Sequence, residues 1–126
     1  MLDIVKQAYG KSASRESCGI LMRRGTLPSE HGGYHFARDL RVKVSALGSF
    51  ALDQIMAFAK NIRCEVLNIR GDPGLTFDKP EYYNLVLDEI ERHAKRVQRH
   101  VIKGYHHLHM DDAATVAGCI VPFLKS

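Results

Sequence analysis

The sequence contains no tryptophan, and none of its three cysteines stands in a C-x-x-C pair. Cys18, Cys64 and Cys119 are widely spaced and odd in number, which favours reduced thiols in a cytosol-like compartment over a disulfide framework. No apolar run approaches the roughly 18 residues of a transmembrane helix, and the first residues do not read as a secretory signal peptide. Because the last residues, Leu124-Lys125-Ser126, are not a Ser-Lys-Leu peroxisomal address, we expect a cytoplasmic location, with a peroxisomal one left open.

The chain also lacks the clustered basic surface of a nucleic-acid-binding protein. Its 126 residues carry a formal net charge of +4, but the basic residues are scattered and Arg23-Arg24 is the densest pair. No basic stripe interleaved with aromatic residues is present, so we expect no nucleic-acid partner. Hydrophobic residues make up 45% of the chain, which is enough for the core of one modest domain.

Hydrophobic periodicity and turn residues predict helices that alternate with strands in the second half of the chain. In chain order we expect helix 2–9, a helix capped by Ser14 and ending at Gly25, a loop over 26–33, short strands 34–36 and 39–44, a helix capped by Ser49, strand 64–70 closed by the turn Gly71-Asp72-Pro73-Gly74, a helix from Pro80 to about Val97, strand 98–103 and a final helix capped by Asp112. The alternation implies parallel βαβ units and an α/β protein. Two convincing strands do not form a sheet with both faces covered, so we expect part of a larger α/β domain.

Three of the seven histidines stand within four positions, in the run GYHHLHMDD that begins at Gly104. The spacing His107-x-His109-x-Asp111-Asp112 is close to the H-x-H-x-D-H run of metallo-β-lactamase-like hydrolases, whose zinc sites use histidine and carboxylate ligands. Aspartate replaces the last histidine, however, and few residues follow for the further ligands of that fold. A metal-dependent hydrolase is therefore the less favoured alternative, and we expect no metal or other cofactor.

General-base catalysis is the second chemistry that this run supports. A histidine directly after a strand lies at the carboxyl edge of an α/β sheet, where such folds bind ligands, and its imidazole titrates near neutrality. Asp72 follows the preceding expected strand and so comes to the same edge. The order of acid and then histidine is that of α/β-hydrolases. This interpretation selects His106 as the base and Asp72 as its acid, with His107 and His109 as packing or supporting groups.

A surface turn with three partly exposed histidines explains the same run without any chemistry. Gly-Asp-Pro-Gly is likewise an ordinary turn sequence, so Asp72 carries little weight by itself. From the residue pattern alone, the catalytic, metal-binding and structural interpretations all stay open.

Several short motifs follow one another along the chain in a specific order. They are Cys18-Gly19, Arg24-Gly25-Thr26, Phe36, Arg38-Asp39-Leu40-Arg41, Ile69-Arg70-Gly71, the run from Gly104 to His109, Asp111-Asp112, Val116 and Phe123-Leu124. In this order they resemble the serine hydrolase-like proteins of the α/β-hydrolase superfamily, and the C-terminal run resembles that of epoxide hydrolases and haloalkane dehalogenases. The resemblance covers nearly all 126 residues.

The resemblance implies that the chain is the C-terminal part of an α/β-hydrolase fold. Residues 1 to about 62 would match the end of a helical cap and the segment that returns to the sheet, and residues 63–126 would match the last two parallel strands with their flanking helices. His106 takes the place of the catalytic histidine. The place of the family acid falls at Gly74, where the nearest carboxylate is Asp72.

A serine hydrolase also needs a nucleophile on a G-x-S-x-G elbow beside an oxyanion hole, and no such elbow is present. The nearest string is Gly10-Lys11-Ser12-Ala13-Ser14, which ends in serine and follows a helix-like segment. The resemblance places the nucleophile before Met1.

Two functions from different classes therefore remain. The first is the C-terminal portion of a serine hydrolase that cleaves a small-molecule ester or similar acyl substrate, for which this chain supplies the histidine and a candidate acid. The second is a catalytically silent, hydrolase-derived fragment or interaction module. Neither the substrate nor the oligomeric state follows from the residues.

Overall fold

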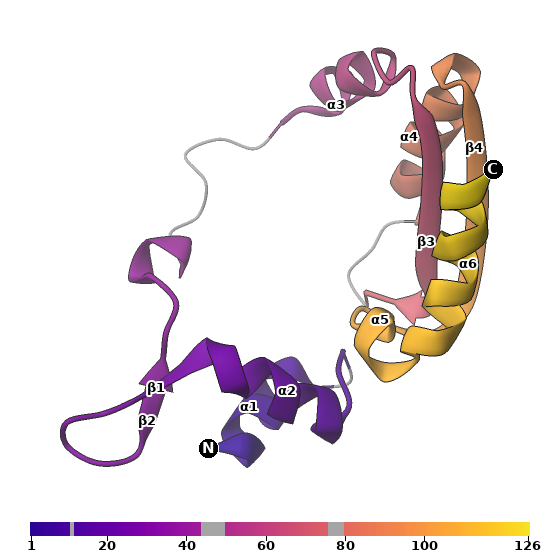
Figure 1. Ribbon diagram of the computed structural model, residues 1–126. Helices are drawn as coiled ribbons and strands as arrows, with labels where there is room; N and C mark the ends of the chain where they lie inside the picture. Colours follow the sequence, from indigo (N-terminus) through magenta and orange to yellow (C-terminus); the bar gives the residue numbers. More distant parts are fainter. Residues whose placement is uncertain (11, 44–49, 76–79) are drawn as a thin grey trace.

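The computed structural model of the chain describes residues 1–10, 12–43, 50–75 and 80–126. Its elements in chain order are α1 (Leu2–Tyr9), α2 (Arg15–Gly25), β1 (Thr26–Pro28), β2 (Tyr34–Phe36), the 3-10 helix η1 (Leu40–Lys43), α3 (Leu52–Ala59), β3 (Glu65–Gly74), α4 (Pro80–His93), β4 (Arg96–Tyr105), α5 (Leu108–Asp111) and α6 (Ala113–Lys125). Figure 1 shows a strand-rich part with α3 to α6 and a second part with α1, α2 and the β1–β2 hairpin. The two parts meet where α5 lies against α2.

Helices α1 and α2 form the first part around a small apolar core. Val5, Ala13 and Cys18 are buried there, and Tyr9 and Phe36 pack against them. Ser14 begins α2 as expected, because its side-chain oxygen accepts a hydrogen bond from the Ser17 N–H and so satisfies one of the free amides of the first turn. The sequence predictions for both helices are confirmed.

The second part is a βαβα unit built on a parallel pair of strands. β3 and β4 pair in parallel from Glu65 opposite Arg96 to Gly74 opposite Tyr105, and α4 is the crossover between them. In Figure 1, α4 passes behind the strands and α6 passes in front of them. Asp112 begins α6 as predicted, since its carboxylate accepts a hydrogen bond of 3.2 Å from the Thr115 N–H. The prediction of an α/β fold with two parallel strands and flanking helices is confirmed.

The prediction that Gly71-Asp72-Pro73-Gly74 forms a turn is wrong, because these residues continue β3 to its end. They pair with Ile102–Tyr105 of β4, so the parallel ladder overrides the local preference of this string for a turn. Gly71 allows the two strand ends to come close together. A Cβ atom added there would lie 2.6 Å from the Gly104 carbonyl oxygen and 2.9 Å from that of Tyr105.

The expected helix from Pro80 to Val97 is too long, since α4 ends at His93 and β4 begins at Arg96. Strand pairing explains the earlier end. The carboxylate of Glu65, the first residue of β3, forms ion pairs with Lys95 Nζ at 2.9 Å and with Arg96 Nη2 at 2.7 Å. Arg96 is also the residue that pairs with Glu65 in the β3–β4 ladder.

Two predictions for the first half are also wrong. Residues Thr26–Pro28 lie in a strand that pairs with Tyr34–Phe36, although the whole of 26–33 was expected to be a loop. Residues 40–43 form η1 where a strand was expected, and Asp39 begins this turn by accepting a hydrogen bond from the Arg41 N–H. Ser49, the expected cap of the third helix, lies outside the described residues. The helix itself is confirmed, and Gln54 Oε1 accepts a hydrogen bond from the Ala51 N–H before its first turn.

The strand-rich part leaves apolar surface uncovered. Within the described residues the sheet has only two strands, so each strand has one free edge. Val101 of β4 is 70% exposed and Leu124 of α6 is 75% exposed. No helix among the described residues is long and apolar enough to cross a membrane.

The substitution Gly71→Ala is expected to destabilise the β3–β4 pair, because the new methyl group would overlap two backbone oxygens that have little room to move. Overpacking of this kind costs about 1–3 kcal/mol. Hydrogen exchange measured by mass spectrometry should therefore become faster in peptides that cover β3 and β4.

Gly118→Ala is the matched control, because nothing lies within 4 Å of its Cβ position on α6. It should leave the β3–β4 peptides unchanged and stabilise the helix by roughly 0.5–1 kcal/mol. Equal protection of β3 and β4 in both variants would contradict the close approach at Gly71.

Candidate active site at the histidine turn

His106, His107 and His109 lie where β4 ends and α5 begins, and we call these three residues the histidine turn. β4 ends at Tyr105, so His106 is the first residue beyond the strand. β3 ends beside it, because Gly74 is paired with Tyr105, and Asp72 is paired with Lys103. The structure therefore brings Asp72 and His106 to the same carboxyl edge of the parallel pair, the edge at which α/β folds bind ligands.

Both candidate catalytic side chains are exposed at this edge. Among the described residues, no hydrogen bond or ion pair joins Asp72 to His106. The His106 ring instead lies edge-on to His107, with 4.9 Å between ring centroids. The roles of His106 as base and Asp72 as acid therefore stay predictions. Among the described residues, one histidine contacts a carboxylate: His93 Nε2 lies 3.2 Å from Glu89 Oε1. Both residues lie on α4 before β4 begins, so this contact is at the other end of the parallel strands.

His107 attaches the histidine turn to α1 and the segment after it. Its backbone N–H donates a hydrogen bond of 3.0 Å to the Ser12 carbonyl, and its ring meets the Tyr9 ring edge-on with 5.3 Å between centroids. Its Nδ1 is buried and has no hydrogen-bond partner within the described part of the chain. Burial lowers the pKa of His107 below its ordinary value, and the neighbouring His106 and His109 lower it further.

Asp111 forms a second attachment, to the start of α2. Its carboxylate accepts hydrogen bonds from the Ser17 hydroxyl at 2.5 Å and from the Ser14 N–H at 3.1 Å. Partial burial raises the pKa of Asp111, but the hydrogen bonds from Ser17 and Ser14 outweigh it, so the pKa lies below the usual value for aspartate. Tyr9 and Ser12, which contact His107, and Ser17, which contacts Asp111, are residues of this site that the sequence did not predict. No local sequence signal could have found them, since Ser17 and Asp111, for example, lie 94 positions apart.

The other candidate residues differ in their surroundings. His109 is exposed on α5, with 5.7 Å between its ring centroid and that of His107. Within the described ranges, no group of three or more histidine, cysteine, aspartate or glutamate side chains is arranged to hold a metal ion. Ser12 follows α1 and donates its hydroxyl hydrogen bond to the Tyr9 carbonyl, so it does not lie on a strand–turn–helix elbow.

Comparisons with known proteins identify relatives of the chain. No family model matches the sequence. A probable serine hydrolase from Drosophila melanogaster is 45% identical over 127 residues, which cover 99% of this chain and 38% of the relative. A serine hydrolase-like protein from Danio rerio is 26% identical over 116 residues, covering 89% of this chain and 34% of that protein. The chain thus spans little more than a third of the length of these relatives.

The fold also resembles a solved hydrolase structure. The thioesterase domain from the curacin biosynthetic pathway aligns with a TM-score of 0.70 at 27% sequence identity, over 96% of this chain and 41% of that domain. Together with the two relatives, it confirms the resemblance that the sequence motifs indicated. The chain is an α/β-hydrolase-fold homologue, and its sequence is related to part of the serine hydrolase-like proteins.

Asp111→Ala is expected to loosen the attachment of α5 to α2, because the Ser14 N–H and the Ser17 hydroxyl both lose their acceptor. The loss of such hydrogen bonds costs roughly 1–3 kcal/mol. Amide exchange at Ser14, measured by NMR, should become faster. Asp53→Ala, a change at an exposed position on α3, is the control and should have no effect on Ser14. If Asp111→Ala also leaves this exchange rate unchanged, Asp111 does not hold α2.

The histidine turn is expected to detach from Tyr9 in acid. The pKa of His107 is lower in the folded state than in the unfolded state. Such a histidine stabilises the folded state at pH values above its unfolded pKa, and this stabilisation is lost as the pH falls through the folded pKa. The Asp111 carboxylate acts in the same direction at lower pH, because its folded pKa is also depressed. An NMR titration should therefore show that His107 protonates below its ordinary pKa, near 6.5. A pKa at or above 6.5 would show that burial against Tyr9 does not control this ring.

Proposed function

We propose that this chain supplies the histidine, and the acid, of a serine hydrolase that cleaves small-molecule esters or similar acyl compounds. The observation that carries the proposal is the place of His106, directly beyond β4 and beside the end of β3. The similarity to a probable serine hydrolase and to a thioesterase domain agrees with acyl transfer by a serine nucleophile. That serine would come from a G-x-S-x-G elbow outside these 126 residues.

In this proposal the chain has two functional regions. Residues 1 to about 62 correspond to the end of a cap and the segment returning to the sheet, while residues 63–126 correspond to the last two strand–helix units. Two attachments join these regions, since Asp111 and His107 link the second region to α2 and to Ser12. The first region, residues 1 to about 62, would thereby hold the histidine turn in position.

In the complete enzyme, His106 would accept the proton of the serine hydroxyl and then donate it to the leaving group. Asp72 would orient the imidazole and stabilise its charged form. Asp72 stands two ladder positions before the end of β3, so its carboxylate must reach along the strand edge toward His106. The half-buried ring of His107, which packs against Tyr9, would support the His106 ring that it meets edge-on.

A catalytically silent interaction module is the second candidate. The observation that favours it is the exposure of both His106 and Asp72 without a hydrogen bond between them. The uncovered sheet edges would then serve to bind another protein rather than to complete an enzyme.

His106→Ala in the complete protein, with the G-x-S-x-G elbow present, should lower ester hydrolysis by roughly 10²- to 10⁴-fold, because the general base is lost. His107→Ala and His109→Ala are the matched controls at the neighbouring positions and should cost much less. Asp72→Asn should lower the rate at an unchanged KM if Asp72 is the acid.

A fluorophosphonate probe separates the two candidate functions. It should label the complete protein and spare the 126-residue chain. Failure of the complete protein to react would favour the silent module, while a greater loss in His109→Ala than in His106→Ala, or inactivation by a chelator, would favour a metal-dependent hydrolase.

A further inference from the structure

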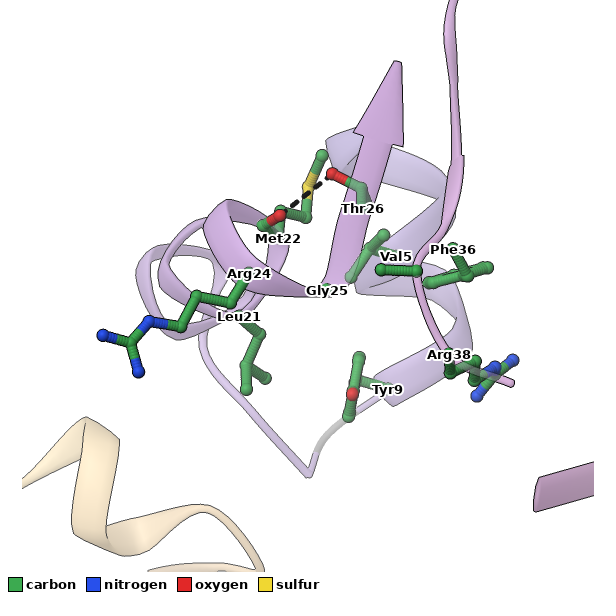
Figure 2. A pocket seen from close by; sticks show the side chains of 10 residues that line it. Val5, Tyr9, Leu21, Met22, Arg24, Gly25, Thr26, Phe36 and Arg38 are labelled. Carbon is green, nitrogen blue, oxygen red and sulfur yellow. Dashed lines mark hydrogen bonds between the residues drawn. The ribbon is translucent and has the colours of Figure 1, made fainter. Parts of the chain in front are cut away.

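A pocket of about 560 Å³ lies in the first part of the chain, away from the strand edge. Its walls come from α1, α2 and the β1–β2 hairpin, and Figure 2 shows the side chains of Val5, Leu21, Met22 and Phe36 around it. This volume falls within the range of about 300–1,000 Å³ that small-molecule sites occupy. The Thr26 hydroxyl donates a hydrogen bond of 2.9 Å to the Met22 carbonyl, so this polar group of the lining is already satisfied.

Arginine side chains flank this apolar pocket. Arg24 and Arg38 both contribute to the lining, and Figure 2 shows them extending away from its centre on different sides. Their aliphatic stems can therefore cover apolar surface while their charges stay near solvent. Within the part of the chain that the structure describes, neither arginine forms an ion pair.

Arg38 is the better placed of the two to meet a ligand. Its guanidinium carbon lies 4.6 Å from the centroid of the Phe36 ring, and that ring itself lines the pocket. The adjacent carboxylate, Asp39, does not neutralise it, since Asp39 accepts hydrogen bonds from Arg41 Nη2 at 2.6 Å and from Arg41 Nε at 3.0 Å. A positive charge that no described carboxylate pairs with thus stands at the border of an apolar pocket.

We propose that this pocket binds a linear monocarboxylate, with the alkyl chain between α1, α2 and Phe36 and the carboxylate on the Arg38 guanidinium. The Arg38 guanidinium beside Phe36 matches a single carboxylate, because Arg24 extends on a different side of the pocket. The apolar walls match an unbranched chain. A guanidinium binds a carboxylate through two parallel N–H donors, which a neutral alcohol cannot replace.

The pocket is connected to the histidine turn through one side chain. The Tyr9 ring lines the pocket and also meets the His107 ring edge-on. Binding does not depend on the proposed catalysis, however, because His106 is not part of the lining. His106→Ala should therefore leave binding intact, so failure of the proposed function and failure of the pocket proposal can be distinguished.

Isothermal titration of the 126-residue chain with decanoate, below the concentration at which it forms micelles, tests the proposal. Decanoate should bind at one site, and Arg38→Gln should raise its dissociation constant by about fivefold to tenfold. Arg38→Lys keeps the charge and should lose less affinity. Arg23→Gln removes an exposed arginine of α2 that does not line the pocket, and it should bind as the unaltered chain does.

Two further measurements identify the site and the chemistry. Met22→Trp should fill the pocket and prevent binding, whereas Ile20→Trp, on an exposed face of the same helix, should not. Decanol should bind to the unaltered chain more weakly than decanoate does. In Arg38→Gln, decanol and decanoate should bind with equal affinity. Equal affinities for decanoate in Arg38→Gln and Arg23→Gln, or continued binding in Met22→Trp, would overturn the proposal.

Discussion

The parallel pairing of β3 with β4 is the constraint on which the rest of the structure depends. It runs without interruption from Glu65 to Gly74, and the glycine at position 71 lets the last residues of both strands lie close together. The register sets where each strand ends. It thereby places Asp72, the end of β3 and His106 at one edge of the sheet, which is the precondition for any triad built on this chain.

The N-terminal helices hold the histidine turn at that edge. Ser12 and Tyr9 bind and cover His107, while Ser14 and Ser17 bind the Asp111 carboxylate. A turn that follows a strand of a two-stranded sheet has few contacts of its own. These attachments supply the contacts, and they make the first part of the chain a support for the candidate site as well as the wall of an apolar pocket.

The sequence predicted those elements whose signals are local. Ser14 and Asp112 each place an oxygen where a helix needs an acceptor, and both caps are present. It failed where pairing with a distant strand decides the conformation: the string from Gly71 to Gly74 favours a turn alone but continues β3 beside β4. The site follows the same rule. His106 could be selected from its position after a strand, whereas the contact of Tyr9 with His107 joins distant parts of the chain and leaves no local signal.

The central claim, that His106 faces the nucleophile of a serine hydrolase, is tested most directly by a structure of the complete protein with a phosphonate bound to its serine. The account predicts the imidazole of His106 within hydrogen-bond distance, about 2.6–3.2 Å, of the serine oxygen or the phosphonate, with a carboxylate on its other nitrogen. A structure in which His106 points into solvent while another histidine occupies that place would contradict it.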